Sequence, residues 1–208
     1  MMSKEMYTES ASVDKERMLK YKTFAAAFSY PDDSFFAFFP NLSSEKENLI
    51  SEYDGLFRAN EIWLYSTEYL AKNEFQRSNN LADIMGFYRA FGLEPNGDRP
   101  DSLSCEFEFM HFLIFKKVYA LESEDDADAE EKAFICLDAQ KKFFAEHLYP
   151  AAIKIAGAII AKTKKEWREN VPPQTPNLEE NNFYIKIAHE MLQFLESEKK
   201  LLGGDTLE

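Results

Sequence analysis

The sequence predicts an all-α protein, and three observations support that fold class. Glycine is scarce, with 7 in 208 residues, whereas an architecture of strands and tight turns uses it freely. Apolar residues recur at helical spacing in one segment after another, and no stretch shows the alternation of a half-buried strand. The chain also holds 19 Phe and 10 Tyr, enough for a sizeable core. We therefore expect one helical domain over residues 13–202, with flexible ends at 1–12 and 203–208.

Two helices are expected in the first sixty residues. The first runs from about 13 to 29, and Pro31 stops it. Asp32-Asp33 then caps a short aromatic turn. The next helix is predicted to begin at Ser44, because Glu47 stands where a capping box requires an acid. The two apolar stripes are Met18, Tyr21, Phe24, Ala25 and Phe28, followed by Leu49, Ile50, Tyr53, Leu56 and Phe57.

A helix, a polar loop and a strongly apolar helix are predicted between residues 81 and 121. Gly92 can adopt the left-handed conformation that closes the first of these helices. Pro95, Gly97 and Pro100 keep the loop from becoming helical. Asp101 or Ser102 is expected to cap the second helix by accepting hydrogen bonds from its free N–H groups.

Asp101 is the strongest candidate for a binding residue in this loop. The pattern places its carboxylate on an exposed loop, at the positive end of a helix. The alternative is that Asp101 is only a helix cap, worth about 1 kcal/mol of stability. Asparagine caps a helix nearly as well, so Asp101→Asn is expected to change stability little.

The second half of the chain is predicted to be helical as well. The acidic run from residue 122 to 131 reads as a solvated loop and the first turn of a helix that reaches Tyr149. Pro150 is expected to break or kink that helix, and another covers 151–167. A proline-rich loop at 170–177 precedes the last helix, 178–202, whose stripe is Phe183, Ile187, Met191, Phe194 and Leu195.

Composition limits the partners and the compartment. The net charge of −13 argues against nucleic acid and suits a cationic peptide, although acidity can also serve solubility alone. Cys105 and Cys136 are isolated in apolar helical runs, as expected of free thiols in a reducing compartment. The N-terminus lacks an apolar signal core, and no apolar run reaches the ~20 residues of a membrane span. We therefore expect a cytoplasmic protein with no stable membrane insertion.

No catalytic or metal-binding motif emerges from the sequence. Glu108 and His111 have the spacing of a di-iron bundle, but that site needs a second Glu-x-x-His pair. His147 and His189 lack a glutamate three residues earlier, and there is no phosphate loop. The expectation is no catalytic residue, no metal and no cofactor.

Several segments, taken in order, resemble the TorD/DmsD-like redox enzyme maturation chaperones, which are related to the nitrate reductase delta subunit (NarJ-type) chaperones. Glu52-Tyr53 with Leu56-Phe57 is similar to their Glu-Tyr-x-x-Leu-Phe element, and residues 88–93 are similar to their Tyr-x-x-Phe-Gly segment. The loop and helix of residues 99–110 resemble their Pro-Asp-His loop and the Leu-Glu-Phe-Met helix that follows. The further matching segments are Phe28 to Asp32, Phe143, His147 and Phe183-Tyr184. The resemblance covers roughly residues 15–200, and it departs at Ser102, where the family usually carries histidine.

The resemblance implies a TorD-like helical bundle that is not an enzyme. Such proteins bind the twin-arginine signal peptide, or the apo form, of a molybdopterin oxidoreductase subunit, and assist cofactor insertion and assembly before export. An arginine of that peptide could pair with Asp101 in a bidentate manner. The predicted client-binding residues are Asp101, Ser102, Tyr88, Phe91, Pro100, Glu106 and Trp63, with Tyr65, Tyr69 and Phe87 as further groove candidates.

Other possibilities stay open at this point. The chain could bind the surface of a redox enzyme that is never exported, or it could be a helical enzyme of another kind. The sequence identifies neither the client nor the oligomeric state, which is a monomer or a homodimer. It also leaves open whether guanine nucleotide binds and what Ser102 changes.

Overall fold

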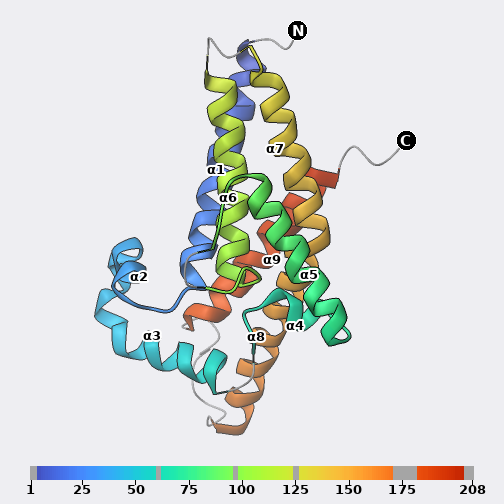
Figure 1. Cartoon of the computed structure of the whole chain (residues 1–208). Helices are drawn as coiled ribbons and strands as arrows, with labels where there is room; N and C mark the ends of the chain where they lie inside the picture. The colour runs from blue at the N-terminus through green and yellow to red at the C-terminus, as the bar shows by residue number, and fades with distance from the viewer. Residues whose placement is uncertain (1–3, 60–61, 96–97, 124–126, 171–181, 204–208) are drawn as a thin grey trace.

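The computed structural model describes residues 4–59, 62–95, 98–123, 127–170 and 182–203, and it is helical throughout (Figure 1). In those ranges the only extended pairing is a single bridge between Tyr65 and Ser102. The all-α prediction is confirmed. The helices are α1 (Lys4–Ala27), α2 (Asp33–Phe38), α3 (Lys46–Tyr53), α4 (Ser66–Leu70), α5 (Glu74–Ala90), α6 (Leu103–Glu122), α7 (Ala129–Phe143), α8 (Tyr149–Asn170) and α9 (Phe183–Gly203).

The helices form a bundle with two lateral extensions. Helix α6 lies between α1 and α7, and α9 crosses behind them, while α8 continues from the end of α7 (Figure 1). Helices α2 and α3 project on one side, and α4 and α5 lie on the other. The residues just before α6 lie beside the short α4, because Ser66 N–H donates to the carbonyl of Asp101.

Aromatic side chains fill the core between α1, α6, α7 and α9. Tyr21 and Phe24 of α1 pack against Phe107 of α6, and Phe109 of α6 packs against Phe143 of α7. The first half of α6 is largely buried, whereas Phe115 and Tyr119 in its second half are exposed, so burial explains only part of its apolar sequence. A smaller cluster of Phe35, Phe36 and Leu49 joins α2 to α3.

The predicted helix starts before residue 60 have mixed outcomes. Asp32 caps α2 as predicted, because its carboxylate accepts hydrogen bonds from the N–H groups of Ser34 and Phe35. The predicted capping box at Ser44 is wrong. Pro40–Glu45 form a tight 3₁₀ helix, and α3 begins at Lys46 without a side-chain cap. A proline at the first position of that turn holds the chain helical before Ser44 can act as a cap.

Helix α5 is longer than predicted and ends where predicted. It begins at Glu74 rather than near Leu81, with Asn73 as its cap, and its last turn leads into Gly92. Gly92 has a φ of 73°, and Leu93 N–H donates to the carbonyl of Tyr88. That left-handed glycine closes the helix and turns the chain into the loop before α6.

Pro150 does not break its helix, which corrects that part of the prediction, and the alternative of a kink stays a prediction. A π-helical turn, Phe144–Leu148, joins α7 to α8, and the helical path continues through Pro150. The wider turn falls before the proline, which then occupies the first turn of α8, where its missing N–H costs little.

By length and composition, one helical run in the described part of the chain, Ala129–Lys162, could cross a membrane. Half of its apolar window is buried inside the fold, as in the core helix of a bundle.

The boundaries of the domain are only partly visible. Helix α1 begins at Lys4, well before the predicted start at Val13. Gly97, most of the predicted loop at 170–177, the start of the predicted last helix at Leu178 and the chain end after Gly203 lie outside the described residues. The division into one domain with two flexible ends stays a prediction.

Candidate binding site at the start of helix α6

The extended segment before α4 pairs with the loop before α6. Ser66 N–H donates to the carbonyl of Asp101 at 2.8 Å, and Leu103 N–H donates to the carbonyl of Leu64 at 2.8 Å. Since alternate residues of an extended segment face the same side, Trp63 and Tyr65 lie together beside the loop, with ring centroids 6.4 Å apart. This pairing brings together the predicted site residues, which are distant in sequence.

Asp101 is fully buried, so the prediction of an exposed loop carboxylate is wrong. Its Oδ1 accepts from Arg99 Nε at 2.9 Å, and its Oδ2 accepts from a terminal nitrogen of Arg99 at 2.8 Å. Thr67 Oγ1 also donates to Oδ2, at 2.6 Å. The carboxylate is thus already held by a two-point arginine pair and a hydroxyl.

Ser102, rather than Asp101, caps α6. Its hydroxyl accepts a hydrogen bond from Cys105 N–H at 3.2 Å. The geometry therefore excludes the alternative that Asp101 is only a helix cap. The hydroxyl of Ser102 is enough for capping, so this task does not require the histidine that the family usually carries there.

Arg99 lies over the site and is its most conspicuous cation. Its guanidinium carbon is 4.1 Å from the centroid of the Tyr65 ring, and its nitrogens reach Glu68 Oε1 at 3.4 Å. The Arg99 side chain is 40% exposed, whereas that of Asp101 beneath it is 0% exposed. Arg99 is not among the site residues predicted from the sequence. The signal available was its position two residues before Asp101.

Glu106 is buried one turn into α6 and is not on the surface. Ser66 Oγ donates to its Oε1 at 2.5 Å, and its Oε2 has no partner. Burial raises the pKa of Glu106 well above its ordinary range, and the Asp101 carboxylate nearby adds to that shift.

The predicted aromatic residues divide into buried and accessible ones. Tyr88 is buried, and its hydroxyl donates to the carbonyl of Pro100 at 2.8 Å. Phe91 and Pro100 are half-buried, and the Trp63 side chain is the most accessible of the set, with 49% of the residue exposed. Trp63, Phe91 and Pro100 can therefore reach a partner directly, while Tyr88 anchors the loop from below.

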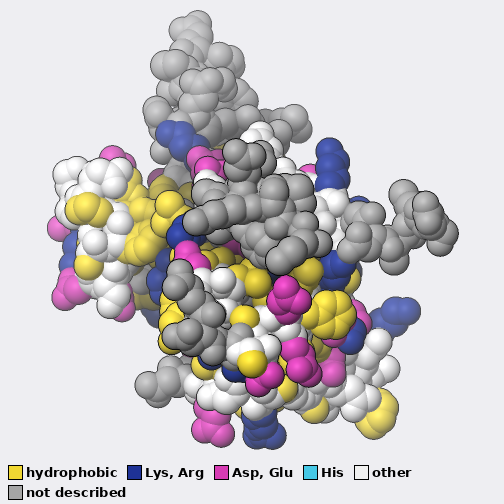
Figure 2. Space-filling view, turned by 90° about the horizontal axis from the view of Figure 1, so that it is seen from above, with side chains coloured by type: hydrophobic (Ala, Val, Ile, Leu, Met, Phe, Trp, Pro, Cys, Tyr) yellow, Lys and Arg dark blue, Asp and Glu magenta, His cyan; other side chains and the backbone are white. Residues whose placement is uncertain are grey.

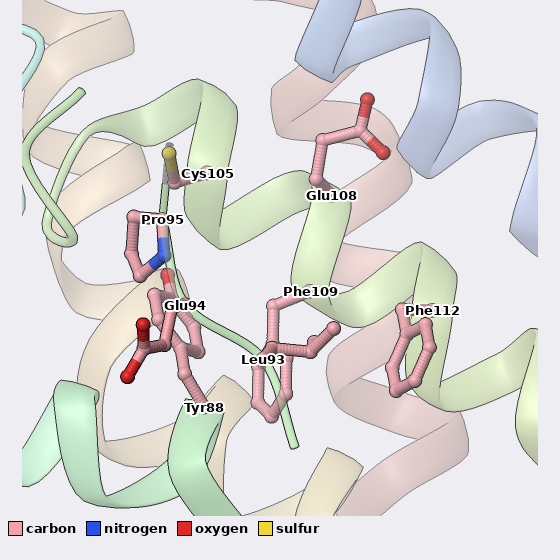
Figure 3. Close-up of a pocket in the computed structure, with 8 residues that line it drawn as sticks. All are labelled: Tyr88, Leu93, Glu94, Pro95, Cys105, Glu108, Phe109 and Phe112. Carbon is pink, nitrogen blue, oxygen red and sulfur yellow. The ribbon is translucent and has the colours of Figure 1, made fainter. Parts of the chain in front are cut away.

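An apolar pocket of about 240 Å³ lies between the residues after α5 and helix α6 (Figure 3). Tyr88, Leu93 and Pro95 line it from the α5 side, and Cys105, Phe109 and Phe112 line it from α6. Glu94 and Glu108 also line it, and Glu108 is engaged by Lys22 at 2.5 Å. Tyr88 belongs to both features, since it lines the pocket and holds Pro100.

Charges of both signs are mixed on one face of the molecule (Figure 2). Figure 2 shows acidic and basic side chains interspersed with hydrophobic ones on the face that it presents. The net charge of −13 therefore gives a general attraction for cations, and local geometry must supply any specificity.

A cluster of Asp83, Glu146 and His147, between α5 and the turn that follows α7, is better explained as a hydrogen-bonded pair than as a metal site. His147 Nε2 lies 2.7 Å from Asp83 Oδ2, and Glu146 is close by. His147 Nδ1 is buried without a partner. Metal ligation through Nε2 would put the proton on Nδ1 and leave a donor orphaned, which disfavours a metal. Glu108 and His111 face different partners, Lys22 and the carbonyl of Met18.

Comparison with known families places this chain in a class. Residues 22–150 match the family described as nitrate reductase delta subunit. The chain belongs to that family, whose members are non-catalytic chaperones for molybdoenzyme maturation. The family implies a nitrate reductase-type catalytic subunit as the partner. No curated protein sequence and no solved structure matches the chain significantly.

Proposed function

We propose that this chaperone acts in the cytoplasm and binds the twin-arginine signal peptide, or the apo form, of a molybdopterin oxidoreductase catalytic subunit. It holds that subunit until its cofactor is inserted and assembly is complete. The observation that carries the proposal is the arginine cradle. Asp101, Tyr65 and Glu68 hold a guanidinium at the surface, beside an exposed tryptophan and close to an apolar pocket.

The cradle and the pocket together fit the chemistry of such a peptide. A twin-arginine peptide presents guanidinium groups followed by an apolar stretch. Carboxylates and aromatic faces bind guanidinium, and an apolar pocket can take a side chain of the following stretch. Tyr88 links the two features, since it lines the pocket and its hydroxyl donates to the carbonyl of Pro100 in the loop that carries Asp101.

The predicted site residues take two kinds of role in this proposal. Trp63, Phe91 and Pro100 contact the client directly. Ser102, Tyr88 and Glu106 are positioning residues that hold the start of α6 and its loop. Asp101 supplies the carboxylate of the cradle.

Replacement of Trp63 tests this site. Trp63→Ala is expected to weaken binding of a fluorescein-labelled twin-arginine peptide about tenfold, because it removes an exposed aromatic anchor. Half of Trp63 is buried, so some stability should be lost, and urea unfolding of the variant checks that it is folded under the binding conditions. Phe134→Ala, which removes another exposed aromatic residue on α7, is the matched control and should keep the parent affinity.

Two results would contradict this proposal. Equal peptide affinity in Trp63→Ala and the parent would put the contact on another surface. A parent protein that fails to bind the peptide, yet co-purifies with a folded catalytic subunit, would favour an assembly factor that recognises the enzyme surface.

A further inference from the structure

The contacts of Arg99 resemble those of an arginine bound from another chain more than those of an ordinary structural ion pair. Its guanidinium makes two parallel hydrogen bonds to Asp101, lies 4.1 Å from the Tyr65 ring centroid and approaches Glu68. A carboxylate fork combined with an aromatic face is the common way in which proteins recognise an arginine from another chain. Here the arginine comes from the loop itself.

The loop does not depend on the Arg99 side chain for its backbone position. Tyr88 Oη holds the carbonyl of Pro100, and Ser66 N–H holds the carbonyl of Asp101. Ser102 N–H donates to the carbonyl of Arg99, which is also a backbone contact. The Arg99 side chain can therefore leave the cradle while the carboxylate of Asp101 keeps its place.

Access to the cradle runs through Arg99. Asp101 has no exposed surface, while the covering Arg99 side chain is 40% exposed. Thr67 donates to the same carboxylate, and the Tyr65 ring lies against the guanidinium of Arg99. An incoming guanidinium that reaches Asp101 must therefore replace Arg99.

We propose that the cradle of Asp101, Tyr65 and Glu68 is a guanidinium-binding site that Arg99 fills in the free protein, and that an arginine side chain of the client displaces Arg99. The inference rests on the proposed function for the identity of the client. Arg99 then acts as a competitor within the same chain. The apparent Kd for the client is the intrinsic Kd divided by the fraction of molecules in which Arg99 has left the cradle. The exchange conserves the buried ion pair, because one arginine replaces another.

Chemical rescue tests the site without any client. Arg99→Ala should have a lower melting temperature than the parent, because Asp101 loses its partner. Tens of millimolar ethylguanidinium should raise that melting temperature by several degrees, and ethylammonium at equal ionic strength should not. Arg89→Ala removes an exposed arginine of α5 and the same charge, so it is the matched control and should gain nothing. The double variant Arg99→Ala with Asp101→Asn should also lose the response.

Peptide affinity tests the competition. Arg99→Ala should bind a labelled peptide with two adjacent arginines and an apolar stretch about tenfold more tightly than the parent. The corresponding lysine peptide should gain much less, because an ammonium cannot make the fork. Arg99→Lys keeps the charge but gives up the fork, and should show the same gain if Arg99→Ala fails to fold.

The outcomes separate the two proposals. No selective rescue by ethylguanidinium, or an unchanged arginine-peptide affinity in both Arg99 variants, would overturn the inference while leaving parent binding as it is. Absence of peptide binding by the parent and by both variants would overturn the proposed function, and with it the role of Arg99 as a competitor.

Discussion

Two carboxyl groups at the start of α6 are both fully buried, but they have different partners. Asp101 meets a guanidinium, whereas Glu106 meets a serine hydroxyl and leaves one oxygen without a partner. Burial without a cation raises the pKa of Glu106. The two buried acids are therefore held differently, Asp101 by an ion pair with Arg99 and Glu106 by a hydrogen bond from Ser66.

Glu106 should make stability depend on pH. Burial raises its pKa well above the ordinary value of 4.5, so the folded protein keeps a proton that the unfolded chain releases above that value. The parent thus loses stability as pH rises beyond 4.5, until the carboxyl ionises in the folded state too. Glu106→Gln cannot ionise, so its stability relative to the parent should increase between about pH 5 and about pH 8.

Urea unfolding at both pH values measures that difference directly. Glu108→Gln is the matched control, because Glu108 lies half-exposed on the same helix beside Lys22. Its substitution is not expected to become more favourable at high pH. A Glu106→Gln advantage that stays constant with pH would show that Glu106 is ionised in the fold.

Asp101→Asn should destabilise the protein, contrary to the expectation for a helix cap. The asparagine amide keeps one acceptor oxygen and places an N–H₂ group against the donors of Arg99 or Thr67. We expect a loss of about 2 kcal/mol, the range for a charge-assisted hydrogen bond, in urea unfolding. Asp98→Asn, an exposed change in the same loop, should stay within about 0.5 kcal/mol of the parent. Equal effects of the two substitutions would mean that Asp101 is not held as described.

At the scale of elements, residue types predicted those helix ends that depend on contacts within a few residues of the end. Asp32 and Gly92 act within their own helix ends, so their residue types were enough to place a cap and a stop. Asn73 offered the same kind of signal and was overlooked, which is why α5 begins earlier than predicted. Pro150 shows the limit of such rules, because a widened turn upstream absorbed its effect.

The sequence predicted which residues belong to the site, but not how their side chains are arranged. The sequence placed Asp101, Tyr88 and Trp63 near one another through a family resemblance. It could not show that Asp101 faces inward, because the hydroxyl of Thr67 that reaches it comes from 34 residues earlier in the chain. Burial of a loop carboxylate depends on such distant partners, which periodicity does not reveal.

At the scale of the whole molecule, a buried ionic cluster joins α1 to α9. Arg17 of α1 donates to both oxygens of Glu198 of α9, at 2.7 and 2.8 Å, and to Asp14 at 2.7 Å. Tyr21 also donates to Glu198, and Lys117 of α6 reaches Asp14. These contacts fasten α9 across α1 and α6, which form the scaffold that carries the loop and the cradle (Figure 1).

Removing one member of this cluster should cost far more than removing an exposed pair. Glu198→Ala leaves Arg17 buried without its main partner, and we expect a loss of about 3–5 kcal/mol in urea unfolding. Glu122→Ala breaks the Lys15 pair, in which both side chains are 56% exposed, and should cost no more than about 1 kcal/mol. Similar losses in the two variants would contradict a buried cluster.

A double substitution separates the cost of an orphaned charge from the value of the pair. In Arg17→Met with Glu198→Met no charge is left unpaired between α1 and α9, so most of the stability lost in Glu198→Ala should return. If the double variant unfolds as easily as the single one, the ion pair itself stabilises the bundle. If it recovers, the pair serves mainly to select this packing of α9 over others, and the cradle depends on that packing rather than on the charges.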